Sequence, residues 1–167
     1  RSYFHPRAAL GFNDTLFMTL QEISGSDYFH PVQWCLSDDE GSTWTEPCPV
    51  PGFDRKDTGD GISEGVCDVV PGFHAATETI LALGHNVYYR EGRLFDSLGT
   101  WNNDAGSLKL QRFPVYTVQN EKGEWLPERK KLVCPELTEC SIYTSGCSQR
   151  IILQDENILL PLSFGNW

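Results

Sequence analysis

The sequence lacks several features that mark whole classes of protein. No apolar run approaches the roughly 20 residues of a membrane-spanning helix, so we expect no membrane span. Basic residues are few, since 13 Lys and Arg stand against 23 Asp and Glu and the net charge is −10. No basic patch stands out, which argues against nucleic acid as a partner. Sustained helical periodicity is also missing, which argues against a helical fold.

Cysteine spacing of the kind that binds zinc is absent as well. The six cysteines form no C-x-x-C pair, and the histidines and carboxylates show no ligand spacing. The sequence therefore indicates no metal site and no cofactor. Cys35 and Cys67 lie inside apolar, strand-like runs, which favours free buried thiols over a full disulfide framework. The remaining cysteines are Cys48, Cys134, Cys140 and Cys147.

The most informative motif is the segment 37–44, which reads S-D-D-E-G-S-T-W. A carboxylate at Asp39 can accept backbone N–H bonds within a tight turn. Gly41 can adopt a positive φ without steric cost. Trp44 is large enough to pin the turn against a sheet, so we expect it to be mostly buried. The segment therefore predicts a β-hairpin tip held by its own side chains.

Strand signals surround this turn. The segments 7–12 and 15–20 read as a hairpin closed by a polar turn, and 31–36 reads as a third strand. The segment 43–50 contains Pro47 and Pro49, which places a fourth strand at a sheet edge. Four consecutive antiparallel strands make one blade of a β-propeller.

The same pattern then recurs along the chain. A hairpin that would begin a second blade covers 66–70 and 79–83. The strand 113–118 is followed by a degenerate copy of the turn at 119–125. A third opening follows at 150–153 and 158–162. We therefore expect an all-β chain of about two and a half four-stranded antiparallel blades. Their ranges are 1–52, 66–133 and 146–167. A closed propeller needs further blades, so the chain is expected to be a fragment.

The turn 37–44 is similar to the Asp box of the sialidase superfamily. The runs 5–7, 67–71 with His74, and 145–150 resemble those of bacterial exo-α-sialidase-like BNR-repeat proteins. This resemblance implies a six-bladed β-propeller that hydrolyses terminal sialic acid or a related acidic sugar. It also implies a secreted or periplasmic location, although no signal peptide is visible.

The resemblance also implies roles for single residues. Arg7 and Arg150 start equivalent strands and would grip the substrate carboxylate, which a guanidinium binds through two parallel N–H donors. Asp27 or Asp68 would be the catalytic acid/base. His74, or His85, would bind sugar or handle a proton beside an Asp.

Glu136, with Glu139 as its rival, would activate a tyrosine nucleophile. That tyrosine and a third arginine are expected in later blades, outside this chain. Two other functions stay open. One is a non-catalytic Asp-box propeller that binds glycans or proteins, and the other is a different hydrolase or lyase on the same scaffold. The tyrosine and third arginine, if present in the longer protein, would favour the sialidase.

Overall fold

The computed structural model describes residues 2–25, 27–95, 110–145 and 150–166. Strands make up most of the regular structure in this part of the chain. The helical elements described are single 3-10 turns, η1 (Phe12–Asp14), η2 (Ala75–Thr77) and η4 (Pro135–Leu137). No helix among these residues is long and apolar enough to cross a membrane. The predicted all-β class is confirmed.

The first sheet has the order β1-β2-β4-β5, and β3 pairs with β2. Its neighbouring strands are antiparallel, with Leu10 opposite Leu16 at the closed end of the first hairpin. The strands are β1 (Tyr3–Leu10), β2 (Leu16–Ser24), β3 (Tyr28–Phe29), β4 (Gln33–Ser37) and β5 (Cys48–Pro49).

The second sheet has the order β11-β10-β8-β7-β6, and β9 pairs with β8. The long hairpin of β7 and β8 dominates it, because its pairing extends from Ile62 opposite Arg90 to His74 opposite Thr79. Its strands are β6 (Lys56–Gly59), β7 (Ile62–His74), β8 (Thr79–Arg90), β9 (Arg93–Leu94), β10 (Pro114–Asn120) and β11 (Lys130–Lys131).

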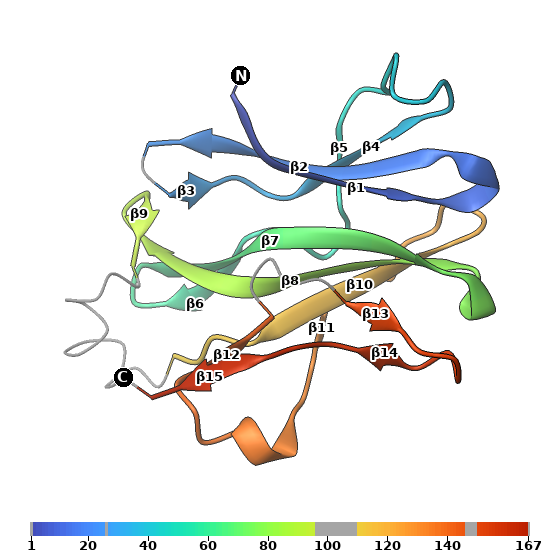
Figure 1. The fold of residues 1–167 in the computed structure, drawn as a ribbon. Coiled ribbons are helices and arrows are strands. Elements are labelled where there is room, and N and C mark those ends of the chain that lie inside the picture. Colours follow the sequence, from blue (N-terminus) through green and yellow to red (C-terminus); the bar gives the residue numbers. More distant parts are fainter. Residues whose placement is uncertain (1, 26, 96–109, 146–149, 167) are drawn as a thin grey trace.

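The last part of the chain forms two short strand pairs, β12 with β15 and β13 with β14. They lie below the second sheet in Figure 1, while the first sheet lies above it. This succession of antiparallel sheets is consistent with part of a propeller. The strands are β12 (Ile142–Thr144), β13 (Ile151–Ile152), β14 (Ile158–Leu159) and β15 (Ser163–Gly165).

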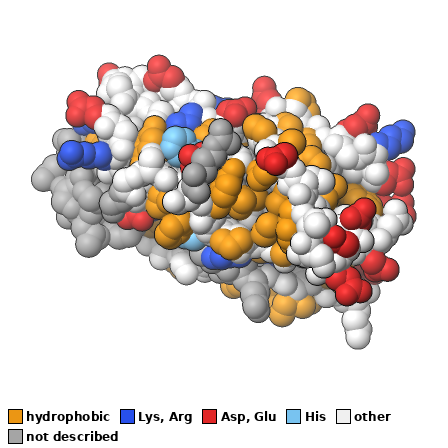
Figure 2. Space-filling view, turned by 90° about the horizontal axis from the view of Figure 1, so that it is seen from above, with side chains coloured by type: hydrophobic (Ala, Val, Ile, Leu, Met, Phe, Trp, Pro, Cys, Tyr) orange, Lys and Arg blue, Asp and Glu red, His pale blue; other side chains and the backbone are white. Residues whose placement is uncertain are grey.

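A hydrophobic core joins the first two sheets. It combines residues from the first sheet and the chain after β5 with residues from β7, β8 and β10. Its members are Val32, Val50, Phe53, Val66, Val69, Ala82 and Val115, with Trp34, Phe113 and Trp125 packed against them. Apolar side chains also remain exposed on β1, and Figure 2 shows hydrophobic side chains across the middle of the upper face.

The strand β7 depends on side chains from the neighbouring segments for part of its hydrogen bonding. On the side away from β8 it pairs with β6 only from Ile62 to Glu64. Farther along, the carbonyl of Val66 accepts from Gln21 Nε2 at 2.8 Å, and that of Val69 accepts from Thr19 Oγ1 at 2.8 Å. Thr19 and Gln21 are both buried. These bonds satisfy main-chain oxygens that would otherwise be buried without a partner.

The turn 37–44 has the hydrogen bonds that its sequence predicts. Oδ1 of Asp39 accepts from the Thr43 amide and from the Ser37 hydroxyl, both at 2.8 Å, and Oδ2 accepts from the Thr43 hydroxyl at 2.7 Å. The indole N–H of Trp44 donates to the Gly41 carbonyl at 3.1 Å. Trp44 itself is half-buried, so the expectation of a mostly buried indole is too strong. The turn is held by its own hydrogen bonds, and less of the indole ring is buried than expected.

We expect this turn to make stability depend on pH in the acid range. The bonds from Thr43 and Ser37 lower the pKa of Asp39 from 3.8 to about 2. The carboxylate therefore stabilises the fold above pH 3.8, and this contribution is lost as the pH falls through about 2. Asp39→Asn should unfold at a lower urea concentration than wild type at pH 7, and the two midpoints should converge toward pH 2.

The matched control is Asp38→Asn, which removes one charge from the same turn without touching these bonds. Its urea midpoint should stay close to that of wild type at every pH. A constant difference between Asp39→Asn and wild type from pH 7 to pH 2 would contradict this account of the turn.

Candidate functional site

Four side chains with acid–base or ligand chemistry meet where β1 passes β7. They are His5 on β1, Cys67 and Asp68 on β7, and His85 on β8. Cys67 and His85 are directly opposite in the β7–β8 ladder, so their proximity follows from strand register. His5 comes from the other sheet, and the site therefore exists only because the two sheets pack together.

Irregularities in both strands aim these side chains at one another. The register of β1 shifts between Phe4 and Arg7, and that of β7 shifts between Cys67 and Val70. At these bulges His5 has φ 51° and Asp68 has φ 54°. A left-handed backbone costs free energy at a residue that is not glycine, and such strain is concentrated at functional sites. Two facing bulges with this feature mark the cluster as a candidate site.

Asp68 is at the centre of the cluster. Its Oδ1 lies 3.2 Å from Nδ1 of His5, in an ion-pair contact that lacks hydrogen-bond geometry. Its Oδ2 lies 3.8 Å from Nε2 of His85, and that nitrogen lies 3.3 Å from Sγ of Cys67. The carboxylate thus has one imidazole on each side.

The cluster has a buried side and an open side. His85 and Cys67 are both 4% exposed, whereas the side chains of His5 and Asp68 are 30% and 21% exposed. Burial and the positive charge of Arg112 lower the pKa of His85 to about 4, although Asp68 opposes the shift. His85 is therefore neutral at physiological pH, and within the described part of the chain the exposed side of the cluster is that of His5 and Asp68.

Aromatic side chains continue the site beyond His5. The imidazole of His5 packs on Phe29, with ring centroids 5.0 Å apart. Arg55 donates to the Phe29 carbonyl, and its guanidinium lies 4.3 Å from the ring centre of Tyr28 and 3.7 Å from that of Tyr89. This guanidinium is held by cation–π contacts on both rings.

Arg7 and Arg150 are in different surroundings. Arg7 is half-buried on β1, opposite Thr19, and its Nη1 donates to the Pro6 carbonyl at 3.1 Å. Being two residues from His5, it lies within about 7 Å of it along the strand. Arg150 donates to the carbonyls of Val70 at 3.1 Å and Leu81 at 2.9 Å. Its role in carboxylate binding stays a prediction, but these bonds make it a link between the last segment and the second sheet.

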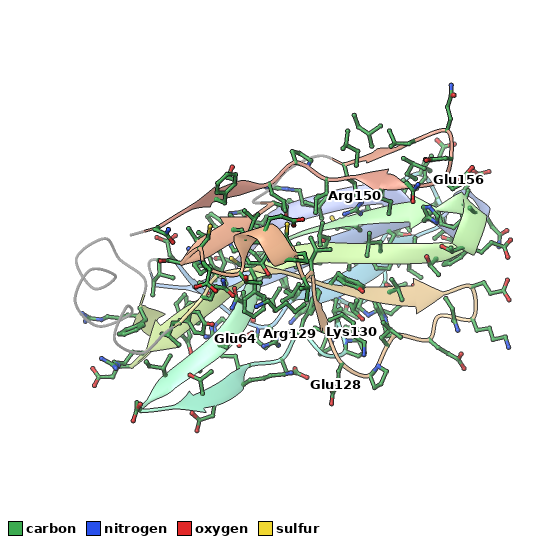
Figure 3. The ribbon with its side chains drawn as sticks, turned by 90° about the horizontal axis from the view of Figure 1, so that it is seen from below. Glu64, Glu128, Arg129, Lys130, Arg150 and Glu156 are labelled. Carbon is green, nitrogen blue, oxygen red and sulfur yellow. The ribbon has the colours of Figure 1, made fainter. Side chains whose placement is uncertain are left out.

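The link through Arg150 is close-packed and half-buried. A Cβ added at Gly72 would come within 2.4 Å of Nη2 of Arg150, so only glycine leaves room for the guanidinium there. Burial lowers the pKa of Arg150 to about 10, which leaves it charged at neutral pH. Figure 3 shows Arg150 and Glu156 along one side of the view and the ion-paired Glu64 and Arg129 along the other.

His74 lies at the far end of β7 from Asp68. Six residues of extended strand separate the two, which corresponds to about 20 Å. Its Nδ1 is 2.8 Å from the Thr77 hydroxyl, and its Nε2 is 2.9 Å from the Glu156 carbonyl. These bonds tie the β13–β14 turn to β7, and the structure does not bring His74 to the cluster.

Asp27 and Glu136 lie in different parts of the fold, and Asp27 is two residues before Phe29, the ring on which His5 packs. Asp27 is exposed in the turn between β2 and β3, with φ 55°. Glu136 is exposed in η4, where its Oε2 is 3.4 Å from Sγ of Cys134. In Figure 1, η4 is the orange coil at the lower edge, on the opposite side of the second sheet from β1. The catalytic roles of both residues stay predictions.

Sequence reasoning assigned no role to His5 or Cys67. Cys67 and Cys35 are buried, as their apolar runs predict, and neither forms a disulfide among the described residues. Hairpin register could have found part of the cluster: once the strands 66–70 and 79–83 are extended to meet at a tight turn near 75–78, Cys67 comes opposite Asn86, next to His85. The bulge between Cys67 and Val70 then moves the pairing to His85, and no sequence signal gives that bulge. No signal in the sequence places β1 across β7, so the contribution of His5 could not be found.

Comparison with known proteins supports the fold. No protein-family model and no curated protein matches the chain. Among solved structures, the chain is similar to the Hadza microbial sialidase Hz136, with a TM-score of 0.69 and 15% identity over 98% of this chain and 32% of the sialidase. It is also similar to an ulvan lyase described as a new family of polysaccharide lyase, PL25, with a TM-score of 0.50 and 18% identity over 78% of this chain and 27% of the lyase.

At these identities the likeness shows the fold alone. The chain has a sialidase-like fold, and the resemblance read from its sequence is confirmed at that level. It spans about a third of the length of the sialidase.

We expect Arg150 to contribute to stability through its two main-chain bonds. Arg150→Lys keeps the charge, but one ammonium group cannot replace a guanidinium that bonds two separate carbonyls. The variant should lose about 1.5–3 kcal/mol of unfolding free energy, as measured by urea denaturation.

Arg7→Lys is the control, because the bond of Arg7 stays within its own strand; it should cost less than about 0.5 kcal/mol. Equal losses of unfolding free energy in the two variants would show that Arg150 has no special role in holding the last segment.

Proposed function

We propose that this chain supplies part of the substrate site of a sialidase-like glycoside hydrolase acting on terminal sialic acid or a related acidic sugar. The observation that carries the proposal is the Asp68 carboxylate, held at a strained bulge beside His5 on the open side of the cluster. The sialidase-like fold supports it, because it places this cluster on a scaffold that hosts carbohydrate-active enzymes.

In this proposal the Asp68–His5 pair handles the proton of the reaction. Hydrolysis of a glycosidic bond needs a group that protonates the leaving oxygen and later accepts a proton from water. The carboxylate of Asp68 and the imidazole of His5, with Oδ1 3.2 Å from Nδ1, are both acid–base groups of the kind that this step needs. Their partial exposure leaves them accessible to a sugar, whereas His85 and Cys67 are buried behind them.

Arg7 would bind the carboxylate of the sugar. It follows His5 closely on the same strand, and a guanidinium can bind a carboxylate through two parallel N–H donors. Arg55 is a second guanidinium on this side of the fold, fixed over Tyr28 and Tyr89. The remaining groups of a sialidase, a tyrosine nucleophile and a further arginine, would come from the longer protein.

A lyase acting on an acidic polysaccharide is the second candidate. It is favoured by the likeness to the PL25 ulvan lyase, which covers 78% of this chain. Elimination next to a uronate carboxylate starts with removal of a proton by a base, and an imidazole paired with a carboxylate is suited to that step. The two candidates yield different products. Hydrolysis releases a free sugar that carries a hydroxyl group from water, whereas elimination leaves a carbon–carbon double bond in the product.

We expect Asp68→Asn, made in the longer protein that contains this chain, to lower kcat/KM on a fluorogenic sialoside by about 10²–10⁴-fold. Asparagine tolerates the left-handed backbone at this position about as well as aspartate, so the fold should persist. Asp38→Asn, in the turn 37–44, is the control and should leave turnover unchanged. The 167-residue chain alone should be inactive, because the groups that it lacks must be held in fixed geometry.

Three outcomes would contradict parts of this proposal. Full turnover by Asp68→Asn together with loss in Asp27→Asn would transfer the acid/base role to Asp27. Turnover by the isolated chain near that of the longer protein would show that no group is missing. Release of an ultraviolet-absorbing unsaturated product from an acidic polysaccharide, without sialoside cleavage, would replace the hydrolase with the lyase.

A further inference from the structure

Three ligand-type atoms of the cluster converge on one point. They are Sγ of Cys67, Oδ2 of Asp68 and Nε2 of His85, and all lie within 4.8 Å of one another. A thiol sulfur, a carboxylate oxygen and an imidazole nitrogen are all metal-binding atoms in their deprotonated forms. Nothing in the spacing of the sequence indicates such a site, because His85 is 18 residues from Cys67 and reaches it through strand pairing.

The separations of these atoms match a tetrahedral zinc site closely. Around zinc, with bonds of about 2.3 Å to sulfur and about 2.0–2.1 Å to nitrogen or oxygen, neighbouring ligand atoms are about 3.3–3.6 Å apart. The corresponding distances here are 3.3 Å from sulfur to nitrogen, 3.9 Å from sulfur to oxygen and 3.8 Å from nitrogen to oxygen. Side-chain shifts of a few tenths of an ångström would complete the geometry.

The donor set is also suited to a divalent cation. A thiolate and a carboxylate together carry two negative charges, and a neutral imidazole adds none. The imidazole of His85 presents Nε2 to Cys67 and Asp68. Its Nδ1 is buried without a hydrogen-bond partner among the described residues, so a metal on Nε2 would be the group that fixes the tautomer.

We propose that Cys67, Asp68 and His85 bind one zinc ion, with His5 holding the outward oxygen of the Asp68 carboxylate. The soft thiolate and the imidazole select zinc over magnesium or calcium, which prefer oxygen ligands. Three protein ligands leave the fourth position for water or substrate. The position of His5, 3.2 Å from the other carboxylate oxygen, is that of an outer partner which orients a ligand.

This inference goes beyond the proposed hydrolysis and does not depend on it. Zinc would take Oδ2 of Asp68, while Oδ1 stays beside Nδ1 of His5. Metal binding is measured on its own, without a sugar. Loss of the sialidase proposal would therefore leave the zinc site standing, and the reverse also holds.

The test begins with the protein purified with its full chain, reduced and stripped of metal by a chelator. Zinc is titrated in competition with a chromophoric chelator, and wild type should bind one equivalent. Cobalt, used as a coloured substitute, should give thiolate charge-transfer absorption and the intense visible bands of a tetrahedral ion. Cys67→Ser should abolish the charge-transfer band and weaken zinc binding by more than about 100-fold, and His5→Ala should weaken it by about 10–100-fold.

Cys35→Ser is the matched control, because Cys35 is also a buried thiol on a strand but lies outside the cluster. It should bind zinc and cobalt as wild type does. Because the cobalt spectrum of wild type needs no variant, it also tests the site if Cys67→Ser fails to fold. Absence of stoichiometric zinc binding, a cobalt spectrum without thiolate absorption, or equal loss in Cys35→Ser would each overturn the proposal.

Discussion

The rest of the structure depends on how the carbonyl groups of β7 are satisfied. This strand has a full partner in β8 on one side but only a short one in β6 on the other. Thr19 and Gln21 of β2 supply two of the missing donors, and Arg150 supplies one from the last segment. Because unpaired buried carbonyls are costly, these bonds help to hold the neighbouring segments against β7, together with the apolar core.

The strand β7 also carries part of the candidate site, and the way in which its carbonyls are satisfied is related to the geometry of that site. A bulge interrupts the ladder between Cys67 and Val70, and Asp68 is at this interruption with a left-handed backbone. The carbonyls that accept from Thr19, Gln21 and Arg150 flank the bulge on both sides. Their bonds supply the surrounding structure that a strained residue needs in order to persist. Removing them would release the strain and the alignment of Asp68 with His5.

Much of the fold could be predicted from the sequence, because its signals are local. Alternating apolar residues and the Asn13-Asp14 turn predict the β1–β2 hairpin, and the prolines in 43–50 predict the edge position of the fourth strand. That strand was predicted too long, because only Cys48–Pro49 forms it. The lengths of β7 and β8 were underestimated, since both strands continue well beyond the predicted 66–70 and 79–83. The ends of these two strands contain polar residues and glycine, which do not indicate a strand in the sequence. Their pairing is favourable only beside the neighbouring sheet.

The sequence by itself determined the all-β class, the strand order of the first hairpins and the closed turn around Asp39, since each follows from contacts between residues close in the chain. Only the tertiary structure decided which titratable groups meet. It placed His5 against Asp68 and His85 against Cys67, and it assigned Arg150 and His74 to main-chain links between segments. The physical reason is that these neighbours are set by sheet packing and by a bulge in register, and neither has a local sequence pattern.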